Sequence, residues 1–383
     1  MQFEFATASK IIFGPGRLNT IGDLVGSFGK RVLVISGAPI EITNRLLILL
    51  ESQQGTRQVV IVNHEPTLDS VREVVELARR INPELIIGIG GGSALDMAKA
   101  TSAMLTNPGD VTDYLEVIGQ NKRIQQPCLP LITIPTTSGT GSEVTRNAVI
   151  GSPMHHVKVS LRSPLMLPRV ALIDPELTLS VPPSITAATG LDTLTQLIEP
   201  FTCNNPNPLI AALCLEGIQR VAQSLMHAYE DGSDLQARED MSLAALFSGL
   251  ALANARLGAV HGLAGAIGGE INAQHGAICA ALLPNVMQVN LTALRNRAPV
   301  HQPLERYATI GELLSKDAAI AENGIYWVRS FCMHTRIKPL SAFGLGEQQF
   351  DEIIAKALKS SSMQGNPITL NPAELRTILQ MSL

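Results

Sequence analysis

The cysteines of this 383-residue chain lack the spacing of a zinc knuckle or a disulfide framework, since no two of them form a CxxC pair. In a chain without such a pattern, cysteines pack as small hydrophobic side chains, and we expect free thiols in a reducing compartment. The five are Cys128, Cys203, Cys214, Cys279 and Cys332.

The chain also lacks an excess of positive charge, with a formal net charge of -4 at pH 7. A protein that binds nucleic acid in general must neutralise phosphates with lysine and arginine, so this balance argues against a nucleic-acid partner. The first ten residues include Glu4 and no apolar core. They do not resemble a secretory signal, and we therefore expect a cytoplasmic protein.

A clear membrane span is missing as well. The only membrane-like stretch runs over residues 244–269 and is rich in alanine, leucine and glycine. Asn254, Arg256 and His261 interrupt it. Because polar groups inside a bilayer are costly, this stretch predicts a buried helical core and no membrane partner.

Length and pattern predict two domains, because 383 residues exceed what one hydrophobic core usually supports. Short β-branched runs alternate with helical spacing in the first part, which predicts a parallel sheet with helices on both faces. Beyond Pro182-Pro183 the pattern turns helical, and Ser184 is the expected N-cap. We predict an α/β domain over 1–181 and an all-helical domain over 182–383. The predicted strands are 31–36, 58–62, 85–89 and 131–134; the predicted helices are 41–53, 68–81, 184–202, 208–229 and 235–254.

Three consecutive glycines, Gly90, Gly91 and Gly92, follow the apolar run 85–89 and precede Ser93, the expected N-cap of a helix. Glycine lets backbone N–H groups approach an anion, and a helix N-terminus adds partial positive charge. The pattern favours pyrophosphate binding over a plain strand-to-helix turn, although it is not the GxGxxG fingerprint.

A second polar loop, TTSGTGS at residues 136–142, follows the predicted strand 131–134. Its hydroxyl groups suit hydrogen bonding to a ribose, an amide or a phosphate. A solvated surface loop is the alternative. Two such loops after strands of one sheet make a nucleotide site more probable than either does alone.

Asp192, Gln196, His261 and His275 form a candidate metal group. Asp192 and Gln196 are four residues apart on a predicted helix and therefore share one face. A carboxylate and two imidazoles can hold a divalent transition metal and leave positions open for a substrate oxygen. Hydrogen-bonded core histidines are the alternative, and the residues alone leave both interpretations open.

With these motifs in view, the sequence resembles the iron-containing (group III) alcohol dehydrogenase family, from Ile12 to Val286. The resemblance implies a Rossmann-like dinucleotide-binding α/β domain, an all-α second domain, and NAD(P)-dependent interconversion of an alcohol and an aldehyde or ketone, with Fe²⁺ or Zn²⁺ bound. It also implies a homodimer with residues 2–6 at the contact. Its most specific segments are 90–99, 134–145, 174–177, 190–196, Val260-His261 and His275-Gly276.

Carried over by position, the resemblance implies a residue set for each part of the site. Asp192, His261 and His275 would be the catalytic metal ligands, with Gln196 at the fourth ligand position. The coenzyme-binding set would be Gly37, Gly90, Gly91, Gly92, Ser93, Asp96, Thr136, Thr137, Thr145, Lys158 and Leu177.

Three positions depart from the family pattern. Gln196 stands where the family has a histidine ligand, and its neutral amide is a poorer donor, so we expect weaker metal binding. Gly265 stands where another histidine often occurs, which leaves the proton route open and enlarges the pocket. Gly37 replaces an aspartate of NAD-preferring members, so the 2′-phosphate of NADP would not be repelled.

Three alternatives remain at this point. One is a metal-independent enzyme resembling the maleylacetate reductases, in which Arg146, Lys158 or Arg256 would hold a substrate carboxylate. Another is a lyase resembling dehydroquinate synthase. This alternative has less support, because the chain has no dense cluster of cationic residues for a phosphate-bearing substrate. The third is a nucleotide-binding protein without catalytic activity.

Overall fold

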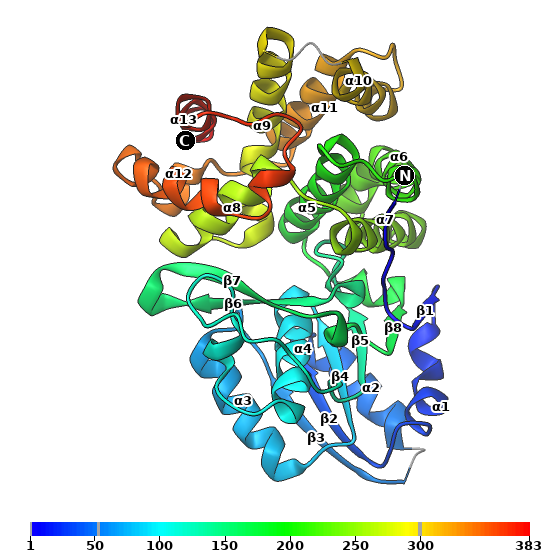
Figure 1. Cartoon of the computed structure of the whole chain (residues 1–383). Helices are drawn as coiled ribbons and strands as arrows, with labels where there is room; N and C mark the ends of the chain where they lie inside the picture. Colours follow the sequence, from blue (N-terminus) through cyan, green and yellow to red (C-terminus); the bar gives the residue numbers. More distant parts are fainter. Residues whose placement is uncertain (1, 52–53, 298–300) are drawn as a thin grey trace. The chain divides into compact units, whose positions relative to one another are not determined.

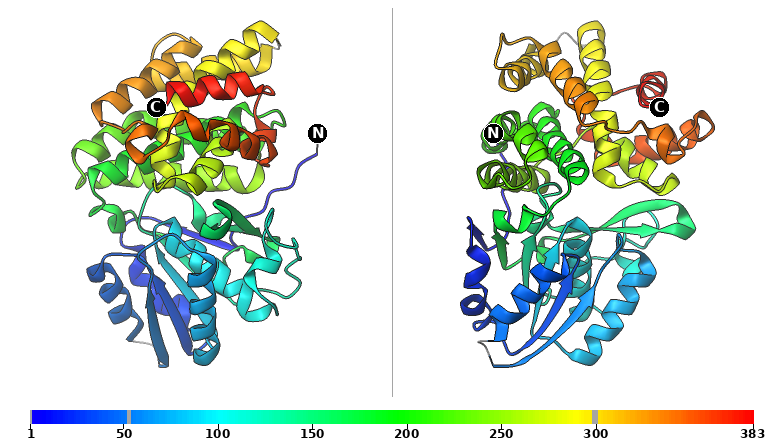
Figure 2. Two further views of the ribbon diagram at one scale, coloured as in Figure 1. Left: turned by 90° about the vertical axis from the view of Figure 1, so that its left-hand side faces the viewer. Right: turned by 180° about the vertical axis from the view of Figure 1, so that it is seen from behind.

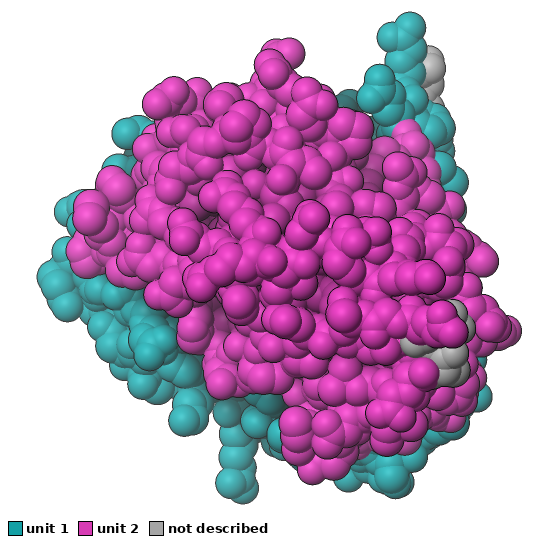
Figure 3. Space-filling view, turned by 90° about the horizontal axis from the view of Figure 1, so that it is seen from below, with its two compact units in different colours: residues 1–4, 138–140, 182–383 teal, residues 5–137, 141–181 magenta. Residues whose placement is uncertain are grey.

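The computed structural model describes residues 2–51, 54–297 and 301–383. Its contacts divide the chain into two compact units, shown in different colours in Figure 3. We call residues 5–137 and 141–181 the α/β unit, and residues 1–4, 138–140 and 182–383 the helical unit. This division says which residues pack together; that 1–181 and 182–383 are independent folding domains stays a prediction.

The α/β unit contains a six-stranded parallel sheet in the order β1-β8-β5-β4-β2-β3. Helices cover both of its faces, as Figure 2 shows and as the alternating pattern predicts. In β2, Leu33 and Ile35 pack with α3 and α4, whereas Val32 and Val34 pack with α1 and α2. The strands are β1 (Lys10–Phe13), β2 (Arg31–Ser36), β3 (Thr56–Ile61), β4 (Leu85–Gly90), β5 (Leu131–Pro135) and β8 (Val170–Ile173); the helices are α1 (Ile21–Val25), α2 (Ile40–Glu51), α3 (Leu68–Ile81) and α4 (Gly92–Thr106).

Most predicted elements of this unit are confirmed, and β2 and α3 match their predicted bounds to the residue. The end of the predicted helix 41–53 lies outside the described residues. The prediction missed the antiparallel hairpin of β6 (Asn147–Ser152) and β7 (Val157–Arg162). Both hairpin strands mix buried with half-exposed and exposed residues, so they lack the continuous apolar run that marks the central strands.

The helical unit is built around α5 (Pro183–Thr202), whose residues from Thr186 onward are nearly all buried. Its glycine at 190 permits close packing on α6, because a Cβ there would lie 2.2 Å from Leu225 Cδ1. The other helices, seen in Figure 1, are α6 (Pro208–Glu230), α7 (Leu235–Asn254), α8 (Ala259–Glu270), α9 (His275–Arg297), α10 (His301–Ser315), α11 (Ala321–His334), α12 (Phe350–Lys359) and α13 (Pro372–Met381).

Two sequence predictions about this unit are wrong. Ser184 is not the N-cap, because α5 begins at Pro183 and Pro182 occupies the cap position. Proline at the first helical position needs no N–H partner, so the helix begins without a side-chain cap. The stretch 244–269 is also not the only membrane-like one. By length and composition, α6 and α9 could each span a membrane, and α7 with α8 forms a pair bent by 91°. In α9, however, 83% of the most apolar window is buried inside the protein, so its apolar character serves the core.

Candidate active site

The loop between β4 and α4 has the geometry of an anion site. Gly90 has φ +143°, and a Cβ there would lie 2.9 Å from Ala94 Cβ and 3.0 Å from the backbone of Gly37. Gly91 is the N-cap of α4 and provides no side-chain cap. The predicted capping role of Ser93 is therefore wrong, since Ser93 lies inside the first turn. A helix N-terminus with only glycine before it suits a phosphate, which accepts from backbone N–H groups.

Other predicted coenzyme residues lie at the same edge of the sheet. The Gly37 N–H donates to the Ile89 carbonyl at 2.9 Å, and the Thr136 N–H donates to the Gly90 carbonyl at 3.0 Å. A Cβ on Gly91 would lie 3.5 Å from Thr137 Oγ1. The fold thus brings these residues together at the carboxyl ends of β2, β4 and β5, where ligands bind in open α/β sheets.

A buried lysine fixes α4 to the loop that follows β5. The side chain of Lys99 is fully buried, and its ammonium donates to the Ser142 carbonyl at 3.1 Å and to Thr145 Oγ1 at 2.9 Å. It also pairs with Asp96 at 3.0 Å. The Asp96 carboxylate accepts from Ser142 Oγ at 2.6 Å and from the Val149 N–H at 2.9 Å. Asp96 and Thr145 therefore help to hold α4 against the loop after β5, and direct contact of either with a coenzyme stays a prediction.

Lys158 and Leu177 lie in different surroundings from the glycine loop. Lys158, on β7, pairs with Glu65 at 2.5 Å. Leu177 lies in the short 3-10 helix η6 (Pro175–Thr178) and is buried in the cluster that includes α1 and α2. Their roles in coenzyme binding stay predictions.

Glu143 makes the stability of this unit depend on pH. It lies in η3 (Ser142–Val144), where burial raises the pKa of its carboxyl to about 7. A pKa raised by folding stabilises the protein below the ordinary value of 4.5, and this stabilisation is lost as the pH rises through 7. Glu143→Gln should therefore be more stable than the wild type at pH 8, by up to about 3 kcal/mol, with a much smaller difference at pH 5. Urea unfolding at both pH values checks this, and a difference independent of pH would contradict it.

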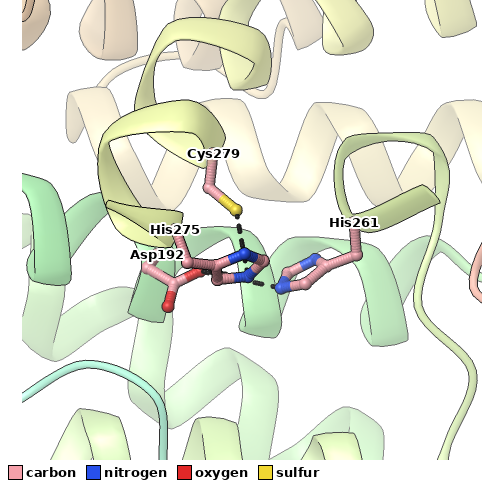
Figure 4. A group of neighbouring side chains, drawn as sticks. All are labelled: Asp192, His261, His275 and Cys279. Carbon is pink, nitrogen blue, oxygen red and sulfur yellow. Dashed lines mark hydrogen bonds and ion pairs between the residues drawn. The ribbon is translucent and has the colours of Figure 1, made fainter. Parts of the chain in front are cut away.

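The metal group is assembled from three helices of the helical unit. Asp192 comes from α5, His261 from α8 and His275 from α9 (Figure 4). One donor atom from each, together with Cys279 Sγ, lies within 4.8 Å of the others. Asp192 Oδ1 is 3.6 Å from His261 Nε2 and 3.9 Å from His275 Nε2. The fold therefore brings together three of the four residues that the sequence singled out as metal ligands.

The group fits a metal ion because donor atoms of two of its residues, and of the neighbouring Gln196, lack a hydrogen-bond partner among the described residues. Asp192 Oδ1, His261 Nε2 and Gln196 Oε1 are buried and have no hydrogen-bond partner in the described part of the chain. Buried polar atoms are normally paired, so each unpaired one calls for a reason. A carboxylate and two imidazoles are donors that zinc and iron accept.

A carboxylate that sequence reasoning missed orients His261. Glu199 Oε2 lies 2.6 Å from His261 Nδ1, and Glu199 Oε1 accepts from the Val260 N–H at 2.7 Å. With Nδ1 donating to Glu199, Nε2 carries the lone pair that a metal needs. Glu199 lies seven residues after Asp192 on α5, on nearly the same helix face. The seven-residue spacing from Asp192 was therefore the feature of the sequence that could have identified Glu199.

The site favours a positive charge at its centre. Burial opposes protonation of His261, but Glu199 and then Asp192 outweigh burial and raise the pKa of His261 to about 10. Burial likewise opposes the ionised form of Asp192, but His261 and His275 outweigh it and lower the pKa of Asp192. Two buried carboxylates around two imidazoles thus create a field that a divalent cation would satisfy.

Glu199→Gln is expected to weaken metal binding about 10- to 100-fold, because an amide orients the imidazole and raises its basicity less than a carboxylate does. Titration of the metal-free protein with zinc measures the dissociation constant. Glu305→Gln, at an exposed position of α10, is the matched control and should leave zinc affinity unchanged. Equal affinities for wild type and Glu199→Gln would show that Glu199 does not support the ligand.

Gln196 and Gly265 lie beside this group. Gln196 Nε2 donates to Asp192 Oδ2 at 3.0 Å, so its amide contacts the carboxylate. Gly265 lies one turn after His261 on α8, and a Cβ there would meet no described atom within 4 Å. The chain therefore leaves open space next to the metal group.

Comparison with known proteins assigns the family. Residues 8–175 match the iron-containing alcohol dehydrogenases, and residues 186–383 match the C-terminal region of the Fe-containing alcohol dehydrogenase family. The chain belongs to the iron-containing alcohol dehydrogenase family. Its members use NAD(P) and a divalent metal to interconvert alcohols and aldehydes, and this chain is an enzyme of that class.

Relatives of this family match the chain along its whole length. Long-chain-alcohol dehydrogenase 1 of Geobacillus thermodenitrificans is 35% identical, over 98% of this chain and 96% of its own. The NAD-dependent methanol dehydrogenase of Bacillus methanolicus is 29% identical, over 97% of each. The crystal structure of a 1,3-propanediol oxidoreductase is 31% identical and superposes with a TM-score of 0.89, covering 100% of both chains. The expected fold class is thereby confirmed.

Proposed function

We propose that this enzyme interconverts a small alcohol and its aldehyde or ketone with NAD or NADP, at a metal ion held by Asp192, His261 and His275. The proposal rests on the convergence of three donors from three helices, of which Asp192 and His261 are buried and each have an unpaired donor atom. Family membership indicates the reaction class, and the positions of the donor atoms indicate where the metal would bind.

The reaction divides into hydride transfer and proton transfer. When bound, the coenzyme would supply C4 of the nicotinamide as the partner for hydride exchange with the carbinol carbon, and the alcohol oxygen would lose a proton. When bound, the metal supplies a Lewis acid that polarises this oxygen and eases loss of the proton. We infer that water or a ribose hydroxyl of the coenzyme carries the proton away, since Gly265 offers no titratable side chain.

The residues of the chain hold and orient the reactants. Glu199 fixes the ring of His261 with Nε2 directed at Asp192. The glycines at 90–92 and the N-terminus of α4 would receive the pyrophosphate. Lys99 and Asp96 would keep that loop in place.

Gly37 leads us to propose that NADP is accepted as well as NAD. It follows β2, where a carboxylate would repel a 2′-phosphate. Gly37→Asp should raise the KM for NADPH about tenfold through this repulsion. A Cβ at this position would lie 3.0 Å from Ala94 Cβ and 3.2 Å from the Val62 carbonyl oxygen, so packing must also be controlled for.

Gly37→Asn is the control for this prediction, because it matches aspartate in size without the charge. Initial rates with NADPH and NADH for the three proteins measure the KM values. If asparagine raises the KM for NADPH as much as aspartate does, packing and not charge is responsible. A strong preference of the wild type for NADH would contradict the proposal.

We also propose a cytoplasmic homodimer, with the segment 2–6 at the contact. In support, Phe3 and Phe5 are exposed, at 50% and 39%, and large exposed apolar side chains often mark an interface. Residues 2–6 form no strand in the described chain, so any strand in this segment would form only when two copies pair. Light scattering of the wild type and of Phe3→Ser tests this, and a monomeric wild type would refute it.

A panel of short alcohols and aldehydes with both coenzymes tests the proposed function. The change in nicotinamide absorbance should depend on the alcohol or aldehyde and on added Fe²⁺ or Zn²⁺. If reduction occurs only with a carboxylated ketone and is unaffected by a chelator, the metal-independent reductase is the better description.

A further inference from the structure

Cys279 is a fourth donor atom in the metal group, one that neither the family pattern nor the sequence motifs assign to the site. It lies on α9 one turn after His275, so both side chains project from the same face of one helix (Figure 4). Its sulfur is 3.5 Å from His275 Nε2 and within 4.8 Å of the Asp192 and His261 donor atoms. The side chain is fully buried among them.

The spacing of these atoms fits four-coordinate binding. A tetrahedral ion with bonds of about 2.1 Å to nitrogen and oxygen and about 2.3 Å to one sulfur separates its ligands by about 3.4 to 3.6 Å. The observed separations are 3.5 Å from the Cys279 sulfur to His275 Nε2, and 3.6 and 3.9 Å from Asp192 Oδ1 to Nε2 of His261 and of His275. Small side-chain movements would bring all four donor atoms within bonding distance of one ion.

Gln196 is the competing fourth donor. Its Nε2 donates to Asp192 Oδ2 at 3.0 Å, while its Oε1 has no partner in the described chain. An amide oxygen is neutral and hard, whereas a thiolate is charged and soft and is a preferred ligand of zinc. Between the two, donor chemistry favours the sulfur of Cys279.

We propose that the Cys279 thiolate is the fourth protein ligand of the metal held by Asp192, His261 and His275, and that it biases the site towards zinc over iron. The thiol releases its proton to solvent as the sulfur–metal bond forms, and no electron is transferred. This inference rests on the metal site of the proposed function. Gln196 then donates a hydrogen bond from its Nε2 to the Asp192 carboxylate and does not bind the metal.

X-ray absorption at the zinc edge tests the assignment, on protein reconstituted with zinc chloride. The wild type should show one sulfur at about 2.3 Å beside nitrogen and oxygen ligands. Cys279→Ser should lose the sulfur signal and bind zinc roughly tenfold more weakly or worse. Cys332→Ser, at a half-buried cysteine of the same unit, and Gln196→Leu should both keep the sulfur.

The outcomes separate this inference from the proposed function. Zinc bound by the wild type through nitrogen and oxygen alone would overturn the thiolate ligand and leave the Asp192, His261 and His275 site standing. A wild type that binds no zinc or iron would overturn both. The wild-type spectrum decides the question even if Cys279→Ser fails to fold.

Discussion

Replacing His261 by alanine should lower kcat/KM for alcohol oxidation by about 10³, with loss of stoichiometric metal. The imidazole is one of three donors from three helices, and its Nε2 has no other partner in the described chain. A metal ion supplies several kcal/mol of charge stabilisation to such a reaction, and about 4 kcal/mol corresponds to this factor. Steady-state kinetics and metal analysis of the purified variant measure both effects.

Two controls distinguish loss of a ligand from loss of structure. His227→Ala, at an exposed histidine of α6, should retain metal and activity. Added imidazole should restore part of the activity of His261→Ala, because the truncated side chain leaves a cavity of its shape beside Asp192. Wild-type kinetics in His261→Ala would show that the reaction does not use this group.

Replacing Lys99 by methionine should destabilise the protein by about 3 kcal/mol and raise the KM for the coenzyme. The ammonium is fully buried, and its removal leaves Asp96, the Ser142 carbonyl and Thr145 without their shared donor. Breaking a buried ion pair at one partner costs about 3–5 kcal/mol, and the lower end applies because Asp96 is partly exposed.

Urea unfolding measures the stability of Lys99→Met, and initial rates at varied NAD and NADP measure the KM values. Lys10→Met, at an exposed lysine of β1, is the matched control and should change neither. Both effects are expected, because Lys99 joins α4, the helix that begins at the glycine loop, to the loop after β5. A destabilised variant with unchanged coenzyme KM would show that Lys99 does not position the coenzyme loops.

Strands and helices were predicted well where their burial produces a regular pattern of apolar residues in the sequence. β2 and β4 are continuous apolar runs because they are buried on both faces of a parallel sheet. Helix α3 shows a clear amphipathic spacing and matches its prediction. The hairpin of β6 and β7 was missed because each strand is only partly covered, so neither shows such a run.

In the metal group, the sequence predicted the residues that match the family pattern. It missed residues that only the folded structure places next to them. Asp192, His261 and His275 were singled out, and the structure places them together. Glu199 lies 62 positions from its partner His261, and only its spacing of seven residues from Asp192 on α5 connects it to the predicted ligands. Cys279 was read as a buried apolar residue, because a lone cysteine carries no ligand spacing.

If a metal ion bound in the helical unit makes alcohol oxidation possible, stepwise addition of metal to metal-free protein should restore the activity. The protein is stripped with a chelator and titrated with Zn²⁺ or Fe²⁺, while reduction of NAD or NADP by an alcohol is followed by absorbance. We expect no turnover without metal and activity that rises to a plateau at one ion per chain. Full activity of the metal-free protein would contradict it.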